Sequence, residues 1–573
     1  MKTEMAQVET SLTIDQPKKI ELSHLAALGL LSLGLIFWGL GRLPLIGPDE
    51  PRYAEIARAM FATGDWVTPR LGGIDWFEKP ALTYWLSAAG YSLLGVSEFA
   101  ARFGIALLGT LGALLLYLAG CRLRSNRFGY LSASVLVSSG IWLGFSRVAT
   151  FDLPLAATME MALLAFILWE GRKPGRAKNL LWILFSFALG LAMLAKGLVG
   201  ILLPSAVIGL YALIAGRWRE LLRPAWLLSS IAIFLATISL WYGPMLARHG
   251  WTFIDEFFIA HHFQRYLTNQ YRHPQPFYFF FFVAAAGCFP WSFPLLARIG
   301  GLWRRRRELL RVEAHRFELF VWLWALVPVL FFSFSGSKLP GYILPVFPAL
   351  AMLIAMQLED WWDEAKPSRA QIVSVLLTMG TMFLVAVVIG IRGAQLLGID
   401  KFAAFRLAGM GVLVAVIYLV IWFLLHLRAA TRFLPFGFAV VMVAIVNLVS
   451  PALAERETLK ALGELATHQA QPGERLVFFI NFNHRINFYA TELPLRNSKS
   501  DFVTAMDPAE IPLLIDRYGG QSMLVLAQRE WSDGLIQSPL LRIETLGEQR
   551  GAVKCSPKCD MILMRAFKTT GEK

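Results

Sequence analysis

Charged side chains gather between the first two strongly apolar segments of the chain. The stretch Gly47-Pro-Asp-Glu-Pro-Arg-Tyr53 holds two adjacent carboxylates, an arginine and a tyrosine, and Glu78-Lys79-Pro80 follows it. Carboxylates act as bases or bind an amine, whereas arginine and lysine bind phosphate. Prolines flank these residues and restrict the backbone. We therefore expect a site, rather than a solvated loop, that contains Asp49, Arg52, Tyr53, Glu78 and Lys79.

Further polar residues lie at the ends of other apolar segments, on the side of the protein where we place this stretch. They are Arg147, Asp152, Lys196, His261, His262, Arg265, Lys338 and Tyr342. Ionisable groups near hydrocarbon are costly and usually face a cavity or a partner, although a single charge at the end of a span is often only an anchor. Together these residues predict a ring of positive and negative charges, with Asp152 as a second carboxylate.

Three of these side chains are of the types that bind zinc, namely Glu78, His261 and His262. Two adjacent histidines cannot easily share one ion, so at most one of them would be a ligand. The alternative is that the histidines bond to phosphate or to the backbone. No cofactor is required by the sequence, and a divalent metal such as zinc stays open.

The elements that must position these residues are membrane-spanning helices. The chain has 573 residues, of which 56% are hydrophobic and 16% charged, whereas soluble proteins carry about 25% charged residues. A helix needs about 20 apolar residues to cross the hydrocarbon. About thirteen stretches predict such helices, some of them short: 22–40, 99–120, 130–145, 153–169, 180–194, 198–215, 227–246, 277–297, 317–334, 342–356, 372–391, 407–425 and 433–453.

The net charge of +14 does not indicate nucleic-acid binding, because the basic residues cluster at alternate ends of the spans. Such a distribution follows the positive-inside rule. It places the amino terminus in the cytoplasm and the charged stretch around Asp49 on the outer face. Membrane lipids are therefore expected partners, and nucleic acid is not.

Three parts are expected along the chain. Residues 1–21 form a cytoplasmic leader, residues 22–453 the membrane region and residues 454–573 an exported α/β domain. Within 44–98, helices over 51–62 and 80–94 are expected to lie in the membrane interface. In the last part we expect strands at 476–480, 522–527, 541–546 and 561–565, helices at 459–469 and 508–518, and a disulfide between Cys555 and Cys559.

The layout and motifs resemble the lipid A aminoarabinose transferase family of the GT-C glycosyltransferase superfamily. The resemblance is strongest in Pro48-Asp-Glu-Pro-Arg-Tyr-Ala-Glu55 and Trp76-Phe-Glu-Lys-Pro80. It implies a GT-C fold and a multi-pass protein of the bacterial inner membrane with its active site facing the periplasm. It also implies transfer of 4-amino-4-deoxy-L-arabinose from undecaprenyl phosphate to a phosphate of lipid A, which confers resistance to cationic peptides such as polymyxin.

The resemblance also suggests roles for individual residues. Asp49 would be the base or activating carboxylate, although it could instead hold the 4-ammonium group of the sugar. Glu78 would orient Lys79 or bind a metal, and Asp152 is a second catalytic candidate. The residues expected to bind substrate are Lys79, Arg52, Tyr53, Arg265, Lys338, Tyr342, Lys196 and Arg147.

Two other functions stay open. One is another glycosyltransferase that uses a polyprenyl-phosphate sugar and acts on protein or glycan. The other is a secondary transporter or flippase, which would show repeat symmetry and ionisable groups near the membrane midplane. Neither repeat symmetry nor ionisable groups near the midplane are visible in the sequence. The chain also has no G-x-x-x-x-G-K-[ST] loop to bind a nucleotide.

Overall fold

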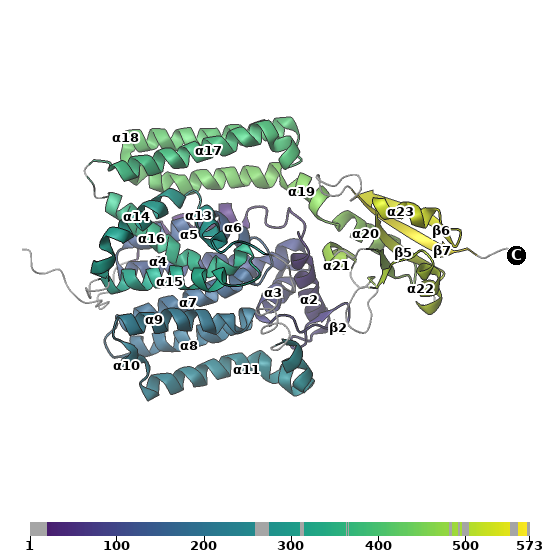
Figure 1. Ribbon diagram of the computed structural model, residues 1–573, viewed down its shortest axis with the longest axis horizontal. Coiled ribbons are helices and arrows are strands. Elements are labelled where there is room, and N and C mark those ends of the chain that lie inside the picture. The colour runs from purple at the N-terminus through teal and green to yellow at the C-terminus, as the bar shows by residue number, and fades with distance from the viewer. Residues whose placement is uncertain are drawn as a thin grey trace, which may run out of the picture.

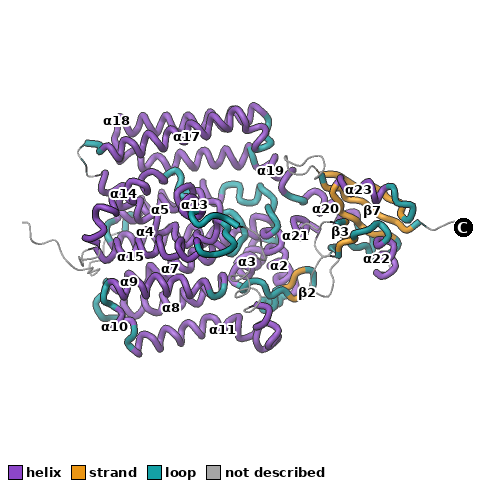
Figure 2. Tube along the Cα trace, in the orientation of Figure 1, coloured by secondary structure: helices purple, strands orange, loops and turns teal. Residues whose placement is uncertain are grey.

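The computed structural model describes residues 20–257, 274–309, 315–362, 364, 366–480, 484–490, 493–494, 503–518, 520–549 and 560–569. Long helices run side by side in one region, and a smaller α/β domain lies at one end of them (Figure 1). In Figure 2 the strands are confined to that domain and to a short hairpin beside α2. The described residues thus divide into a helical region and a C-terminal α/β region.

The helical region begins with α1 and a π-helical turn and ends with α19. Its first half contains α1 (Leu22–Ser32), η1 (Leu33–Phe37), α2 (Asp49–Thr63), α3 (Leu82–Leu94), α4 (Glu98–Leu123), α5 (Asn126–Ser138), α6 (Gly140–Ser146), α7 (Asp152–Glu170), α8 (Arg176–Lys196), α9 (Val199–Ile214), α10 (Trp218–Leu221) and α11 (Pro224–Ile254). Its second half contains α13 (Phe279–Gly287), α14 (Ser292–Leu309), α15 (Arg316–Ser333), η4 (Pro340–Val346), α16 (Phe347–Trp362), α17 (Arg369–Leu396), α18 (Lys401–Leu448) and α19 (Ser450–Glu457).

Fewer helices than predicted meet the requirements for a membrane span. Among the described residues, nine helices are long and apolar enough to cross a membrane, or ten if the bent pair α5 and α6 counts as one span. The long helix α18 supplies two of the nine, Lys401–Leu425 and Ala430–Leu448. The protein is thus a multi-pass membrane protein, and the predicted count of about thirteen spans is not confirmed.

The other three predicted spans are helical but short or interrupted. The first and sixth form the shorter apolar helices Leu22–Phe37 and Val199–Ile214. The eighth is divided into α13 and α14, with Pro290 between them. Proline has no backbone N–H and disfavours a continuous helix, so hydropathy alone overestimates the length of this element.

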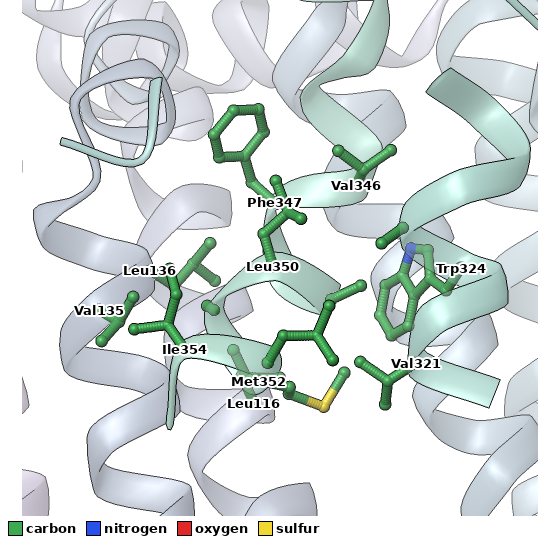
Figure 3. Packing of buried hydrophobic residues seen from close by; sticks show 14 of the residues in the cluster. Leu116, Val135, Leu136, Val321, Trp324, Val346, Phe347, Leu350, Met352 and Ile354 are labelled. Atoms are coloured by element: carbon green, nitrogen blue, oxygen red, sulfur yellow. The ribbon is translucent and has the colours of Figure 1, made fainter. Parts of the chain in front are cut away.

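A large apolar core joins the helices and positions η4. Figure 3 shows side chains from α4, α5, α15, η4 and α16 packed together. Phe347, Leu350 and Ile354 of α16 are almost fully buried, and Trp324 Nε1 donates to the carbonyl of Pro345 at 2.8 Å. This packing fixes η4, whose other end carries Tyr342.

Two short helices and a hairpin lie between the long helices and the α/β domain. Helices α2 and α3 occupy 49–63 and 82–94, where the sequence predicts helices, and β1 (Arg70–Leu71) pairs with β2 (Ile74–Asp75). Gly72 and Gly73 connect the strands with φ of 61° and 83°, a conformation that favours glycine. The hairpin brings Glu78 and Lys79 back beside α2.

The α/β domain contains a five-stranded mixed sheet. Its elements are α20 (Lys460–Gln469), β3 (Leu476–Phe479), η5 (His484–Ile486), α21 (Asn487–Ala490), β4 (Thr504–Ala505), α22 (Glu510–Tyr518), β5 (Ser522–Gln528), α23 (Arg529–Ile536), β6 (Leu541–Gln549) and β7 (Met561–Lys568). The strand order is β4-β3-β5-β7-β6, with β3 parallel to both neighbours and β7 antiparallel to both of its own. Four of these strands and two helices lie where the sequence predicts them, whereas Cys555, Cys559 and residues 1–19 are outside the described residues.

Candidate active site

The charged stretch after the first helix folds into a series of ion pairs. Arg52 Nη2 donates to Asp49 Oδ1 at 2.6 Å, one helical turn earlier in α2. The same nitrogen lies 3.5 Å from Glu78 Oε2, and Glu78 Oε1 lies 3.2 Å from Lys79 Nζ. Charges alternate along Asp49, Arg52, Glu78 and Lys79, so each group is held near one of opposite sign. These four residues, which the sequence selects, thus lie together in space.

Tyr53 is packed against this series. Arg52 Nη2 donates to Tyr53 Oη at 3.2 Å, and Phe151 packs edge-on against the Tyr53 ring with the centroids 4.6 Å apart. Burial, together with the charge of Glu78, raises the pKa of Tyr53 well above its usual value. Burial lowers the pKa of Arg52, but Tyr53, Glu78 and Asp49 outweigh it and leave that pKa raised. The site therefore holds a neutral phenol and a permanent cation near neutral pH.

A second ion pair joins two helix ends. Asp152 begins α7 and Lys196 ends α8, and Lys196 Nζ donates to Asp152 Oδ1 at 2.5 Å. The same ammonium lies 5.0 Å from the centre of the Tyr342 ring. A Cβ added to Gly341 would lie 2.7 Å from Asp152 Cγ and 2.7 Å from Phe145 Cζ. Only glycine allows the backbone of η4 to approach Asp152 this closely.

Both groups of charges face one cavity of about 180 Å³. Residues from several parts of the helical region line it: Asp49, Tyr53, Glu78, Lys79, Pro80, Thr150, Phe151, Asp152, Lys196, Val199, Phe332, Ser335, Ser337, Leu339 and Tyr342. Seven of the residues that the sequence selects are in this set. The cavity thus presents carboxylates and cations together, beside apolar walls, which suits a substrate that carries phosphate.

A buried ion pair holds the backbone that carries Asp49. The Glu50 side chain is 1% exposed and accepts hydrogen bonds from Arg102 Nε at 2.7 Å and Nη2 at 2.8 Å. Glu50 also accepts from the amides of Ile46 and Ala149, at 2.8 and 2.9 Å. Arg102 donates further to the carbonyl oxygens of Leu40, Leu43 and Pro44. All these bonds fix the segment before α2 against α4.

Lys338 and Arg147, which the sequence selects for substrate binding, donate to backbone carbonyls instead. Lys338 is 7% exposed and its Nζ donates to the carbonyl of Ser335 at 2.6 Å, which closes the loop that lines the cavity. Arg147 donates to the last carbonyls of the first helix, those of Leu35, Ile36 and Trp38. Carbonyls at a helix end lack intrahelical partners. Neither cation is among the cavity-lining residues, so for Arg147 the structure favours the anchor reading over substrate binding.

Three selected residues, His261, His262 and Arg265, are outside the described residues. Among the described residues, no group of three or more histidine, cysteine, aspartate or glutamate side chains could hold a metal ion. The zinc site that combines Glu78 with a histidine therefore stays a prediction.

Sequence reasoning missed the pairing of Glu50 with Arg102 and the lining role of Thr150 and Ser335. Arg102 had a usable signal, because it is an arginine inside an apolar segment, where a charge needs a partner. Thr150 had none, although its Oγ1 is buried without a hydrogen-bond partner among the described residues.

The fold and the cavity define a multi-pass membrane protein with a charged cavity among its helices. The chain superposes on the crystal structure of ArnT from Cupriavidus metallidurans bound to undecaprenyl phosphate with a TM-score of 0.75 at 23% identity. The match covers 95% of this chain and 98% of that one. The chain therefore shares the multi-helix membrane fold of that protein.

The sequence comparisons point to the same group of proteins. A family model for dolichyl-phosphate-mannose-protein mannosyltransferases matches residues 27–254. The chain is 36% identical over 312 residues to the undecaprenyl phosphate-alpha-4-amino-4-deoxy-L-arabinose arabinosyl transferase of Pseudomonas aeruginosa, and 32% identical over 366 residues to that of Edwardsiella ictaluri. The matched parts are 54% and 62% of this chain, and 54% and 64% of those relatives. The chain thus aligns with between half and two thirds of their length, and the resemblance to aminoarabinose transferases is confirmed.

Proposed function

We propose that this protein is a glycosyltransferase that moves 4-amino-4-deoxy-L-arabinose from undecaprenyl phosphate to a phosphate group of lipid A. The observation that carries the proposal is the cavity in which Asp49, Glu78 and Lys79 meet Asp152 and Lys196. The arabinosyl transferases to which the chain is similar support the choice of donor. Modified lipid A would make the cell resistant to cationic peptides such as polymyxin.

The charges of the cavity fit the bond changes of this reaction. An oxygen of the acceptor phosphate attacks the anomeric carbon of the sugar, and the bond between that carbon and the undecaprenyl phosphate oxygen breaks. Undecaprenyl phosphate leaves with the electron pair, so negative charge grows on its phosphate. Lys79, supported by Arg52, stabilises that charge. Attack from the side opposite the leaving phosphate inverts the anomeric configuration.

The two aspartates have separate tasks in this proposal. The acceptor phosphate is already largely ionised near neutral pH, so a strong base is less necessary than for a hydroxyl acceptor. Asp49 therefore either activates the acceptor or holds the sugar ammonium, and Asp152 with Lys196 positions the second phosphate. Tyr53 and Tyr342 border the sugar.

The cavity would face the periplasm. Helix α4 runs from Glu98, on the side of the α/β domain, to Leu123, beside Arg124 and Arg127. Basic residues cluster on the cytoplasmic side of inner-membrane proteins. This polarity supports a position of the cavity and the α/β domain on the outer side of the membrane, where lipid A and the lipid-linked sugar would both be reached from the bilayer.

The decisive experiment is mass spectrometry of lipid A from a strain that lacks its own transferase and expresses this protein. We expect a mass gain of one aminopentose for the wild type and none for Asp49→Ala or Lys79→Ala. Arg219→Ala is a matched control, because Arg219 lies in α10, at the end of α9 opposite the cavity-lining Val199. Unmodified lipid A with the wild type, or full modification with both variants, would contradict the proposal.

Transfer to a hydroxyl acceptor is a second candidate, favoured by the family model for protein mannosyltransferases. A reconstituted assay that offers lipid A and a serine- and threonine-rich peptide separates the two, because only the true acceptor gains sugar. Adding a chelator to the same assay tests the predicted metal: loss of transfer that zinc restores would support a site at Glu78.

A further inference from the structure

We infer that the C-terminal α/β domain positions the segment that carries Asp49, and that Tyr489 is the positioning residue through which it acts. The catalytic consequence rests on the proposed function, whereas the structural consequence does not. Figure 1 shows α21, which contains Tyr489, next to α2, which begins at Asp49.

The first contact is a hydrogen bond between residues far apart in the sequence. The backbone N–H of Leu45 donates to Tyr489 Oη at 2.7 Å, and both residues are buried. Leu45 precedes Ile46, whose own amide donates to Glu50. The phenol is thus the buried acceptor at the start of the short segment that ends at Asp49.

A second contact ties the same domain to α4. Lys460 Nζ donates to Glu98 Oε1 at 2.5 Å, and Tyr489 Oη lies 3.5 Å from the same carboxylate oxygen. The Lys460 ammonium also lies 5.7 Å from the centre of the Tyr489 ring. Glu98 is one helical turn before Arg102, which holds Glu50 from the other side. The segment 40–50 is therefore held both by α4 and by the α/β domain.

Aromatic packing supports these polar contacts. Phe488 stacks on Tyr91 with the ring centroids 6.4 Å apart, and Tyr91 Oη donates to the carbonyl of Ala54 in α2 at 3.2 Å. Phe488 and Tyr489 belong to one apolar cluster with Leu45 and Tyr53. The cluster joins the α/β domain to α2 directly, so a shift of one reaches the other.

Loss of the Tyr489 hydroxyl would leave the Leu45 amide buried without an acceptor. A buried amide without a partner is unfavourable, so the backbone is expected to move to regain a hydrogen bond. A displacement of about 1 Å in a reacting group reduces a rate by up to about a hundredfold. Asp49 is four residues away, and whether it activates the acceptor or holds the sugar ammonium, its displacement misaligns the reacting groups, so the effect should fall mainly on kcat.

The test is Tyr489→Phe in the full-length protein, with Tyr518→Phe as the matched control, because Tyr518 lies in α22 and is 40% exposed. We measure kcat and KM for the lipid-linked donor, and amide hydrogen exchange of residues 43–48. We expect kcat to fall about tenfold with KM unchanged, faster exchange in that peptide, and no change in the control. In Lys460→Gln, kcat should fall by about threefold, which lies between the wild type and Tyr489→Phe.

Each result decides the inference. Wild-type kcat and wild-type exchange in Tyr489→Phe overturn it, and so does a rise in KM alone. If the wild type transfers no sugar at all, the proposed function fails, and the exchange measurement still decides whether Tyr489 holds the segment. If Tyr489→Phe does not fold, Lys460→Gln carries the same test, and unchanged exchange in that variant overturns the inference.

Discussion

Asp49 and Glu50 are neighbours in the sequence and lie in opposite surroundings. The Asp49 side chain is 53% exposed at the cavity and keeps one charged partner, Arg52. The Glu50 side chain is 1% exposed and accepts hydrogen bonds from Arg102 and from two backbone amides. This acidic pair at the start of α2 therefore does not act as one unit. One carboxylate stays accessible to a substrate, while the other fixes the backbone that presents it.

The cations divide in the same way. Lys79 and Lys196 line the cavity with carboxylates beside them. Arg102 and Arg147 donate to backbone carbonyls of the first helix and the segment after it. Arginine suits the second task, because its five donors satisfy several carbonyls at once. Of these four cations, the two lysines line the cavity and the two arginines fix the backbone.

The largest contrast is expected between Glu50→Ala and Asp49→Ala. Removing one partner of a buried ion pair leaves the other charge uncompensated, which costs about 3–5 kcal/mol. Glu50→Ala should therefore lower the free energy of unfolding by that amount, while Asp49→Ala changes it by less than about 0.5 kcal/mol. Chemical unfolding in detergent measures both. Equal losses in the two variants would show that the neighbours do not differ as described.

Gly341→Ala should disturb the site without removing any charge. The added methyl group would overlap Asp152, since its Cβ would lie 2.7 Å from Asp152 Cγ. A displacement near 1 Å lowers the transfer rate by about 10- to 100-fold. Gly144→Ala is the control, because no atom lies within 4 Å of the added Cβ there. A wild-type rate in Gly341→Ala would mean that the position of Asp152 is unimportant.

The sequence predicts features that depend on local patterns better than contacts between residues far apart in the chain. The motif at 48–80 and the span ends predict most of the charged residues that meet in the cavity, because charges near the hydrocarbon usually face a cavity or a partner. Strands β3, β5, β6 and β7 follow from alternating or continuous apolar runs. Such signals are local.

Long-range contacts are where the prediction fails. The hydrogen bond between Leu45 and Tyr489 and the ion pair between Glu50 and Arg102 join residues that no local pattern connects. Arg147 was selected for its charge and position, yet its partners are backbone carbonyls, which carry no signal in the sequence. The count of about thirteen spans is not confirmed, partly because hydropathy does not detect the break between α13 and α14.

Glu160 is buried like Glu50 but lacks hydrogen-bond partners among the described residues, so its removal should not lower the free energy of unfolding. It lies in α7, is 0% exposed, and neither oxygen has a hydrogen-bond partner among the described residues. A buried polar group without a partner is unfavourable. Glu160→Met should therefore leave the free energy of unfolding unchanged or raise it by about 1–2 kcal/mol. A loss as large as that of Glu50→Ala would mean that Glu160 has a structural or functional partner.

The smallest effect is expected at Asp65, a carboxylate that has partners and is still reached by solvent. The Asp65 side chain is 18% exposed and accepts hydrogen bonds from Arg248 at 2.7 Å and Arg70 at 2.8 Å. Burial raises the pKa of Asp65, but these bonds and those from the amides of Val67 and Thr68 lower it from 3.8 to about 2. Its charged form is therefore stabilised by folding.

This shift fixes the direction of the pH effect. The pKa of Asp65 is lower in the folded chain than in the unfolded chain. Its contribution to the free energy of unfolding is therefore complete above about pH 4 and is lost as the pH falls toward 2. Solvent screens these charges, so the contribution is on the order of 1 kcal/mol. Comparing chemical unfolding of the wild type and Asp65→Asn across this range isolates the effect, since only the wild type should lose this term on acidification. A constant difference between the two proteins from pH 6 to pH 2 would mean that Asp65 titrates alike in the folded and unfolded chain, and that its partners do no more than those of an ordinary surface ion pair.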